Sequence, residues 1–307
     1  MTIEQHENTA SSLFFTDGFV AARDHILIAA KLNAHDEEYF SRCCRFQKGR
    51  WSFADITDSV VSVCLDPITD AVLWLGQAGT VTSKSRGAPA VQEYIADADR
   101  FGNLNRIRVI GKDVYVCGYA GQVYRRISAT WQHCDRGILV PTADARSLDL
   151  HDIDGTGPDD LYVVGTNGAI FHFDGSRWIY ADPPRNVHFT RIRCVQHDDV
   201  YVCGFKGTIL RGSRRTWHDL TGPDLNDNLY GLDLFQNDIY VARNTGIMRL
   251  SHGKLTPVDI GIPRQFTFHR LHANDGVLWS FGTDDLLWFD GLKWTEVRHP
   301  DNPLNGT

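Results

Sequence analysis

The stretch Leu161–Trp178 reads Leu-Tyr-Val-Val-Gly-Thr-Asn-Gly-Ala-Ile-Phe-His-Phe-Asp-Gly-Ser-Arg-Trp. Apolar residues run up to Gly165, a polar bend leads to Gly168, and a second apolar alternation ends at an Asp-Gly turn before the tryptophan. Alternation with a period of two, interrupted by glycine-containing turns, is typical of strands joined by hairpins. The stretch therefore predicts two paired strands and the start of a third.

The same pattern recurs along the chain. Val114–Trp131 and Val200–Trp217 repeat it, and in all three copies the second glycine lies ten residues before the tryptophan. The residues that close the second strand of successive units follow one another at 42, 47, 39, 39 and 39 residues: Gly76, Gly118, Gly165, Gly204, Arg243 and Gly282. Repeated units of four short strands are typical of β-propellers. We therefore predict an all-β fold, a seven-bladed β-propeller with four antiparallel strands per blade.

The repeats divide the chain into one domain and two tails. We expect a flexible N-terminal tail over 1–12, a single propeller over 13–298 and a C-terminal tail over 299–307. In the fourth blade we expect Ser147–Leu150 as the inner strand. Five tryptophans occupy one register of the repeat and are expected to pack between blades, since large aromatic side chains dominate core burial: Trp51, Trp131, Trp178, Trp217 and Trp294.

Composition limits the partners and the compartment. The net charge of −7 disfavours nucleic acid as the partner, because phosphate binding needs a basic surface. The sequence contains no apolar run of 18 residues, the length that would predict a membrane span, and residues 1–12 do not resemble a secretion signal. The seven cysteines form no Cys-x-x-Cys pair and fall mostly in strand-like runs. We expect a cytoplasmic protein without membrane insertion.

The repeat resembles that of a known group of propellers. Val-Tyr-Val-x-Gly-x-x-Gly-x-Ile followed by Asp-Gly-x-x-Trp is similar to the YCF48-like and BNR/YVTN-like repeat proteins, which are mostly bacterial, and the similarity covers 13–298. Small stand-alone bacterial propellers of this kind resemble immunity partners encoded beside secreted toxins. The resemblance thus implies a non-enzymatic protein that binds and neutralises a cognate toxin. The acidic composition favours a basic secreted toxin as the partner.

Two other functions stay open at this stage. One is an assembly or scaffold factor for a multiprotein complex. The other is a carbohydrate-binding or glycoside-hydrolysing propeller, suggested by Asp174–Trp178 and Asp290–Trp294, which resemble shortened Asp-boxes. The chain has no nucleophile–base motif, so we predict no catalytic residue and no enzyme activity.

One motif resembles a metal-binding loop. Asp152, Asp154, Thr156 and Asp160 place oxygen-bearing side chains at relative positions 1, 3, 5 and 9, as in the calcium loops of FG-GAP-type propellers. Calcium prefers several oxygen ligands from such a kinked loop. The alternative is a polar turn, bent by Gly and Pro, that leads into the strand at Leu161. Apart from this candidate calcium ion, we expect no cofactor.

The candidate binding residues lie in loops of one face. In a propeller, the loops between second and third strands emerge beside the linkers between blades, and we call this side the mouth face. Loops on a rigid scaffold commonly carry binding residues, and aromatic side chains commonly anchor interfaces. From both sets of loops we expect these partner contacts: Tyr119, Asn167, Phe205, Lys206, Asn244, Asp284, Asp285, Arg185, His188, Asp224 and Asp227. Alternatively, Tyr119 and Phe205 fold back onto a neighbouring blade.

Overall fold

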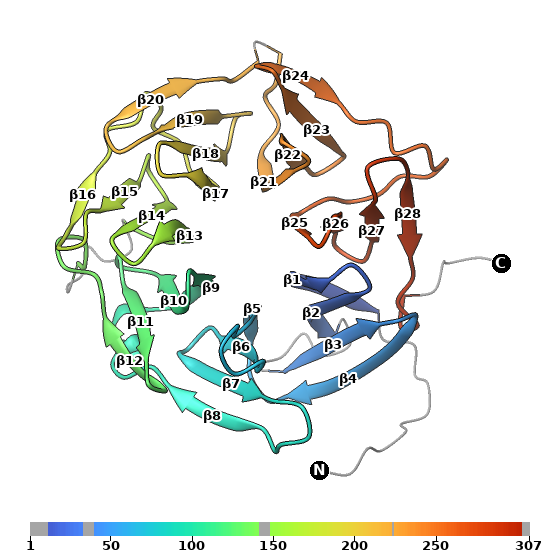
Figure 1. The fold of residues 1–307 in the computed structure, drawn as a ribbon, viewed down its shortest axis with the longest axis horizontal. Coiled ribbons are helices and arrows are strands. Elements are labelled where there is room, and N and C mark those ends of the chain that lie inside the picture. Colours follow the sequence, from blue (N-terminus) through green and yellow to red (C-terminus); the bar gives the residue numbers. More distant parts are fainter. Residues whose placement is uncertain (1–11, 33–39, 141–147, 223, 303–307) are drawn as a thin grey trace.

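The computed structural model describes residues 12–32, 40–140, 148–222 and 224–302. Seven antiparallel sheets of four strands surround a central axis, as Figure 1 shows. Every sheet consists of four consecutive strands, with the first strand innermost and the fourth on the rim (Figure 1). The predicted seven-bladed β-propeller is therefore confirmed.

The strands of the seven blades share one order from the axis to the rim. The first strands line the axis: β1 (Leu13–Ala22), β5 (Val60–Leu65), β9 (Leu104–Ile110), β13 (Leu150–Gly157), β17 (Phe189–Gln196), β21 (Leu229–Phe235) and β25 (Arg270–Asn274). The second strands follow: β2 (His25–Leu32), β6 (Val72–Gly76), β10 (Asp113–Gly118), β14 (Asp160–Gly165), β18 (Asp199–Gly204), β22 (Asp238–Arg243) and β26 (Val277–Phe281).

The outer half of each blade is built from the remaining strands. The third strands are β3 (Ser41–Gln47), β7 (Thr80–Lys84), β11 (Val123–Ile127), β15 (Ile170–Phe173), β19 (Ile209–Ser213), β23 (Gly246–Ser251) and β27 (Leu286–Phe289). The fourth strands are β4 (Arg50–Ile56), β8 (Val91–Tyr94), β12 (Thr130–His133), β16 (Trp178–Tyr180), β20 (Thr216–Asp219), β24 (Lys254–Pro257) and β28 (Trp294–Val297). A short helix, α1 (Ala98–Phe101), lies in the linker between the second and third blades.

The glycine that closes each second strand is required by a close backbone approach. A Cβ atom on Gly165 would lie 2.0 Å from the carbonyl oxygen of Asp149, in the linker that enters the same blade. A Cβ atom on Gly204 would lie 2.4 Å from the carbonyl oxygen of His188. The recurring glycine therefore marks where each interblade linker crosses the end of the second strand.

We expect the substitution Gly165→Ala to destabilise the fold strongly. The new methyl group would overlap backbone atoms, which cannot move aside as a flexible side chain can, and overpacking of this kind costs about 1–3 kcal/mol or more. Gly157→Ala, in the inner strand of the same blade, is the control because a Cβ there meets nothing within 4 Å. Urea denaturation compares the two variants, and equal free energies of unfolding would contradict the explanation.

The tryptophans join neighbouring blades, as the sequence predicted. The indole N–H of Trp131 donates to Glu93 of the preceding blade at 3.0 Å, and that of Trp178 donates to the carbonyl oxygen of Cys134 at 2.6 Å. Trp178 also belongs to a buried cluster that includes Tyr115 of the third blade. These side chains thus bury apolar area between blades and stabilise their order around the ring.

The inner strand of the fourth blade differs from the prediction. The structure has β13 at Leu150–Gly157, so the expected strand Ser147–Leu150 was wrong except at its last residue, and Ser147 lies outside the described residues. The error has a physical cause. Asp152 and Asp154 looked like residues of a turn, but in the strand they form ion pairs with arginines of neighbouring blades.

The ring closes between the first and last blades without sharing a strand. Instead, the amide of Phe15 donates to the carbonyl oxygen of Thr283 at 2.7 Å. The side chain of Asn302 bonds to both the amide and the carbonyl group of Leu13, at 2.6 and 3.0 Å. The residues that follow β28 therefore pack against the first blade and support closure.

Candidate functional site

Hydrogen bonds join the loops of the mouth face into one layer. The amide of Phe205, in the loop after β18, donates to the carbonyl oxygen of His188 in the preceding linker at 2.9 Å. The amide of Gly207 donates to the carbonyl oxygen of Asp227 in the following linker at 2.7 Å. The loops after second strands thus lie between two interblade linkers, and the sequence correctly predicted that both sets share a face.

Four rings on this face form a continuous series, which we call the aromatic arc: His188, Phe205, Tyr230 and His269. Their successive centroid distances are 5.3, 6.3 and 5.7 Å, and each pair meets edge to face. Such geometry is favourable for aromatic pairs. The arc runs across the fifth, sixth and seventh blades and ends where Nε2 of His269 lies 3.1 Å from Oδ1 of Asn244.

The arc combines the two alternatives that the sequence left open for Phe205. Its ring packs against the rings of His188 and Tyr230 from neighbouring segments, and it is still half-exposed. Burial lowers the pKa of His269, which favours the neutral ring near pH 7. The arc therefore presents an aromatic surface whose rings are held by one another, as is usual for residues that anchor interfaces.

Other predicted contact residues surround the mouth at separate places. Tyr119 belongs to the third blade, where its amide donates to the carbonyl oxygen of Asn103 and the charge of Asp149 raises the pKa of its hydroxyl. Asn167 and Lys206 are exposed at the tips of their loops. Both have positive φ values, 54° and 56°, and precede glycines, as expected for a type I′ turn.

The acidic residues have different environments. Asp285 is buried, accepts a hydrogen bond from the amide of Thr267 and forms an ion pair with Arg264, both at 2.7 Å. These contacts make it part of the scaffold of the seventh blade. Asp284 beside it is exposed, and partial desolvation and the charge of Asp285 raise its pKa.

The predicted contact residues in the interblade linkers also differ in their environments. Asp227 is exposed and forms an ion pair with Arg243 at 2.6 Å, and Asp224 is exposed in the same linker. Arg185 forms an ion pair with Asp219 of the rim strand β20 at 2.5 Å. The structure therefore directs Arg185 toward the rim of the propeller, whereas His188, three residues later, belongs to the aromatic arc.

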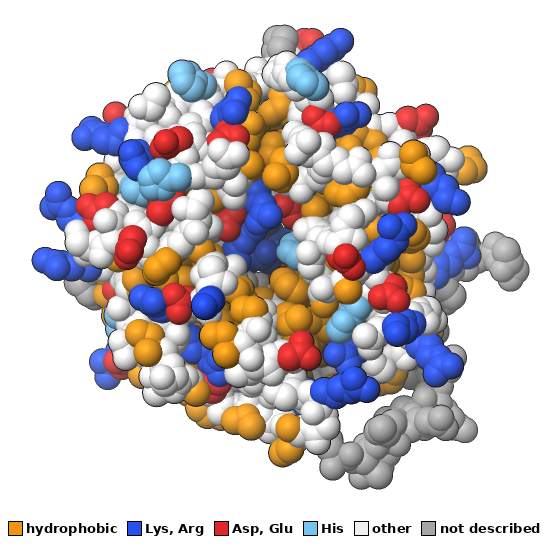
Figure 2. Space-filling view, viewed as in Figure 1, with side chains coloured by type: hydrophobic (Ala, Val, Ile, Leu, Met, Phe, Trp, Pro, Cys, Tyr) orange, Lys and Arg blue, Asp and Glu red, His pale blue; other side chains and the backbone are white. Residues whose placement is uncertain are grey.

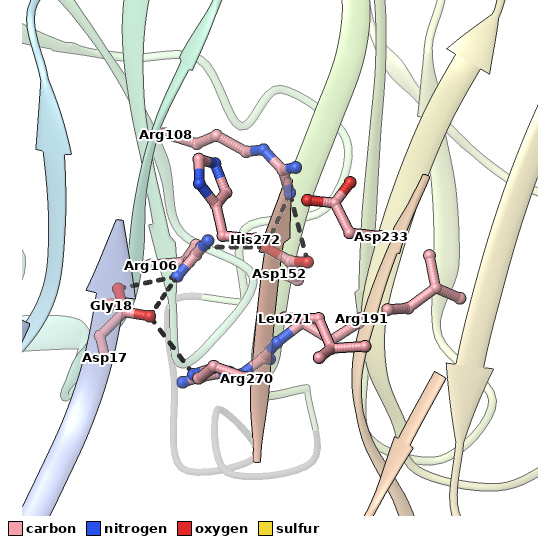
Figure 3. Close-up of a pocket in the computed structure, with 11 residues that line it drawn as sticks. Asp17, Gly18, Arg106, Arg108, Asp152, Arg191, Asp233, Arg270, Leu271 and His272 are labelled. Atoms are coloured by element: carbon pink, nitrogen blue, oxygen red, sulfur yellow. Dashed lines mark hydrogen bonds and ion pairs between the residues drawn. The ribbon is translucent and has the colours of Figure 1, made fainter. Parts of the chain in front are cut away.

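Below the mouth, the inner strands carry charged side chains into the central channel. Arg106, Asp152 and Arg191 occupy equivalent positions in the inner strands of the third, fourth and fifth blades. Each lies opposite the penultimate residue of the second strand of its blade, so all three lie at the mouth end of the channel. With Asp17 and Arg270 they form a group that we call the mouth level (Figure 3). Two residues further along the strands is a deep level: Arg108, Asp154, Arg193, Asp233 and His272.

Asp17 lies at the centre of the ion pairs at the mouth level. Its carboxylate lies 2.8 Å from Arg106 and 3.3 Å from Arg270 (Figure 3). It also accepts hydrogen bonds from the Ser62 hydroxyl and the Val63 amide. Burial alone raises the pKa of Asp17, but the two arginines and these donors outweigh burial and hold the pKa below its ordinary value. One carboxylate thus joins four blades.

The ion pairs continue around the channel. Arg106 also lies 3.2 Å from Asp152, and Arg108 contacts both Asp152 and Asp154, at 3.4 and 3.3 Å. At the deep level, Arg193 lies 3.0 Å from Asp233. From the third blade round to the first, basic and acidic inner strands therefore alternate, whereas the second blade contributes the uncharged Ser62. Each carboxylate compensates guanidinium charges that would otherwise be buried alone.

The candidate calcium ligands do not gather at one point. Asp152 and Asp154 contact arginines in the channel, whereas Asp160 accepts hydrogen bonds from Thr156 and lies 2.8 Å from Nε2 of His172. Among the described residues, no three His, Cys, Asp or Glu side chains form a group able to hold a metal ion. Calcium binding by these residues stays a prediction, made on sequence spacing.

Sequence reasoning missed Tyr230, His269 and the arginines of the channel, and it named Asp152 and Asp154 only as candidate calcium ligands. A signal for the second group exists in the inner strands, where Arg106-x-Arg108, Asp152-x-Asp154 and Arg191-x-Arg193 repeat charges with a period of two. Charged residues at every second position of a strand that lines an axis must compensate one another across blades. Tyr230 and His269 stand one residue before this charged register and carry no comparable signal.

The chain is thus a seven-bladed propeller with ion pairs along its channel and half-exposed rings among the loops of its mouth face. No protein-family model matches the chain. The immune protein Tsi7 of Pseudomonas aeruginosa is 33% identical over 261 residues, which cover 81% of this chain and 85% of Tsi7. The chain belongs to the family of the immune protein Tsi7.

Solved structures support the architecture. YCF48 from Cyanidioschyzon merolae has a TM-score of 0.69 at 9% identity, with 95% of this chain and 97% of that chain covered. The WD40 propeller domain of Doa1 has a TM-score of 0.70 at 12% identity and covers 91% and 92%. At these identities the similarity concerns the fold alone, and it confirms the resemblance to YCF48-like propellers. Among the described residues, no helix is long and apolar enough to cross a membrane.

Proposed function

We propose that this protein is an immunity protein that binds a cognate bacterial toxin and neutralises it through the mouth face. The observation that carries the proposal is the relationship to the immune protein Tsi7 along most of both chains. The match to Tsi7 covers 81% of this chain, which is composed of the repeats that form the blades and the loops that form the mouth face. Binding alone is sufficient for this function, so the chain needs no catalytic group.

The mouth face supplies the contact surface for such a partner. The rings of the aromatic arc are held by one another before binding, so little side-chain entropy is lost when they are covered. Exposed polar tips surround them, including Asn167 and Lys206. A rigid aromatic centre with a polar rim is the usual anatomy of an interface with a strong anchor.

The charge and the thiols of the chain support a proposal for the chemistry of the partner and for the compartment in which they meet. Asp224 and Asp284 are exposed on the mouth face of a chain with a net charge of −7, which favours capture of a basic toxin. All seven cysteines are free, and burial raises the pKa of Cys64 and Cys203. Unpaired thiols are usual in a reducing compartment, so we place the encounter in the cytoplasm.

Co-expression of this chain with the product of each gene adjacent to its own tests the proposal, because the proposal expects one of these products to be a toxin. We expect the toxin alone to arrest growth, and the pair to grow and to purify as a complex of fixed stoichiometry. Recovery with several subunits of a larger assembly and no toxin would support a scaffold factor instead. Turnover of a glycoside by the purified chain would contradict a function based on binding alone.

A further inference from the structure

The pocket at the centre of the ring has an excess of positive charge. Four arginines and three aspartates line it: Arg106, Arg108, Arg191, Arg270, Asp17, Asp152 and Asp233. His272, the other titratable lining residue, adds no charge. Its Nδ1 accepts a hydrogen bond from the amide of Val20 at 2.9 Å, and burial lowers its pKa to about 4. One guanidinium charge therefore has no carboxylate to compensate it within the pocket.

Two arginines at the mouth level carry this excess. Nη1 of Arg270 is buried and has no hydrogen-bond acceptor among the residues that the structure describes, although Nε of the same side chain lies 3.3 Å from Asp17. Arg191 donates to the carbonyl oxygen of the preceding residue, Thr190. An unsatisfied, buried N–H group of a guanidinium is costly, and a hydrogen-bond acceptor placed beside it removes that cost.

The excess charge is reachable from solvent. Both side chains extend into the same pocket in Figure 3, and Arg191 is half-exposed. Figure 2 shows the hollow at the centre of the ring, with Lys and Arg side chains gathered in it. The surrounding protein excludes part of the solvent, so a charge in this hollow interacts with an ion more strongly than it would on an open surface.

We propose that the mouth level of the channel is a binding site for one small oxyanion, a carboxylate or phosphate group, held by Arg191 and Arg270. Guanidinium groups match these anions through two parallel N–H donors. The anion supplies the acceptor that Nη1 of Arg270 lacks and balances the charges of the pocket. It comes either from solution or from the surface of a bound protein, as an acidic side chain that enters the channel.

The test measures thermal unfolding of the purified chain with inorganic phosphate and with acetate, at constant ionic strength. We expect at least one anion to raise the Tm of the wild type by about 2–4 °C when it is present at ten times its Kd. Arg191→Gln should abolish that rise. Arg215→Gln, in the exposed turn between β19 and β20 of the same blade, should keep it and thereby control for general salt effects.

Calorimetric titration of the wild type keeps the test independent of the variants' stability, and a single site is expected. Equal responses of the wild type and Arg191→Gln to both anions, with no calorimetric binding, would overturn the proposal. Repeating the titration on the toxin complex identifies the source of the anion. Loss of binding indicates a side chain of the toxin in the channel, and unchanged binding indicates a free anion. Neither result depends on whether the toxin is neutralised.

Discussion

Replacing Asp17 with asparagine is expected to lower the free energy of unfolding by about 3–5 kcal/mol, the usual effect of removing one partner from a buried ion pair. The variant keeps the shape of the side chain but leaves Arg106 and Arg270 without their shared carboxylate. It also weakens the acceptor for Ser62 and Val63 in the second blade. Urea denaturation, followed by tryptophan fluorescence, measures the change.

The control for this prediction is Asp24→Asn. Asp24 is exposed in the turn that follows β1, so losing its charge should change the free energy of unfolding by less than about 0.5 kcal/mol. A loss of similar size in both variants would mean that net charge, rather than the contacts of Asp17, determines stability. A small loss in both would mean that the channel tolerates unpaired arginines.

The dependence on pH gives the prediction a second readout. Because the folded pKa of Asp17 lies below the ordinary value of 3.8, its ionised form stabilises the fold at every pH above that value. The contribution is lost as the pH falls through the folded pKa. The difference between wild type and Asp17→Asn should therefore stay constant from pH 5 to pH 8 and shrink below about pH 4.

The architecture was predictable because similar local constraints on backbone and packing recur from blade to blade. Gly165 and Gly204 recur since a linker backbone crosses the second strand there, and Gly168 and Gly207 recur since a turn needs positive φ. Tryptophan recurs at the register of Trp178 in five of the seven blades, where it packs against the preceding blade. Constraints that repeat in every blade leave a period in the sequence, which can be counted without coordinates.

The site was less predictable because its contacts join residues of different blades, and the repeat does not show which side chains meet. Phe205 was expected on the mouth face, but its partner Tyr230 comes from the inner strand of the next blade and does not belong to a loop. Asp152 was assigned to a candidate calcium loop because oxygen-bearing side chains follow it at regular spacing, whereas its ion-pair partner Arg106 belongs to the neighbouring blade. Pairing across blades depends on the closed ring, and the local sequence does not encode it.

The channel and the mouth face meet different requirements of the molecule. Ion pairs of the channel link non-adjacent blades, as Asp17 does between the first and third. The mouth face above them can vary without disturbing those links, because its loops are joined mainly through backbone groups such as the amide of Gly207. A propeller of this kind can change what it binds while the inner strands preserve its stability.

Substitutions in the aromatic arc should therefore have the largest effect on the affinity for the toxin. The double variant Phe205→Ala, Tyr230→Ala removes two consecutive rings from the centre of the arc, and truncation of interface anchors typically costs about 2–4 kcal/mol. We expect the Kd for the cognate toxin of the proposed function to rise by about 30-fold or more, since each 1.4 kcal/mol is a factor of ten. Calorimetry or surface plasmon resonance with an inactive toxin variant measures the change.

The opposite face of the propeller provides the matched control. Leu292 is 91% exposed in the turn between β27 and β28, far from the loops of the mouth, so Leu292→Ala removes exposed apolar area without touching the arc. Its Kd should match that of the wild type. If Leu292→Ala weakened binding and the double variant did not, the toxin would bind the face of the turns between third and fourth strands. In that case the arc would serve only to pack the fifth, sixth and seventh blades together, and its loss would appear in the free energy of unfolding alone.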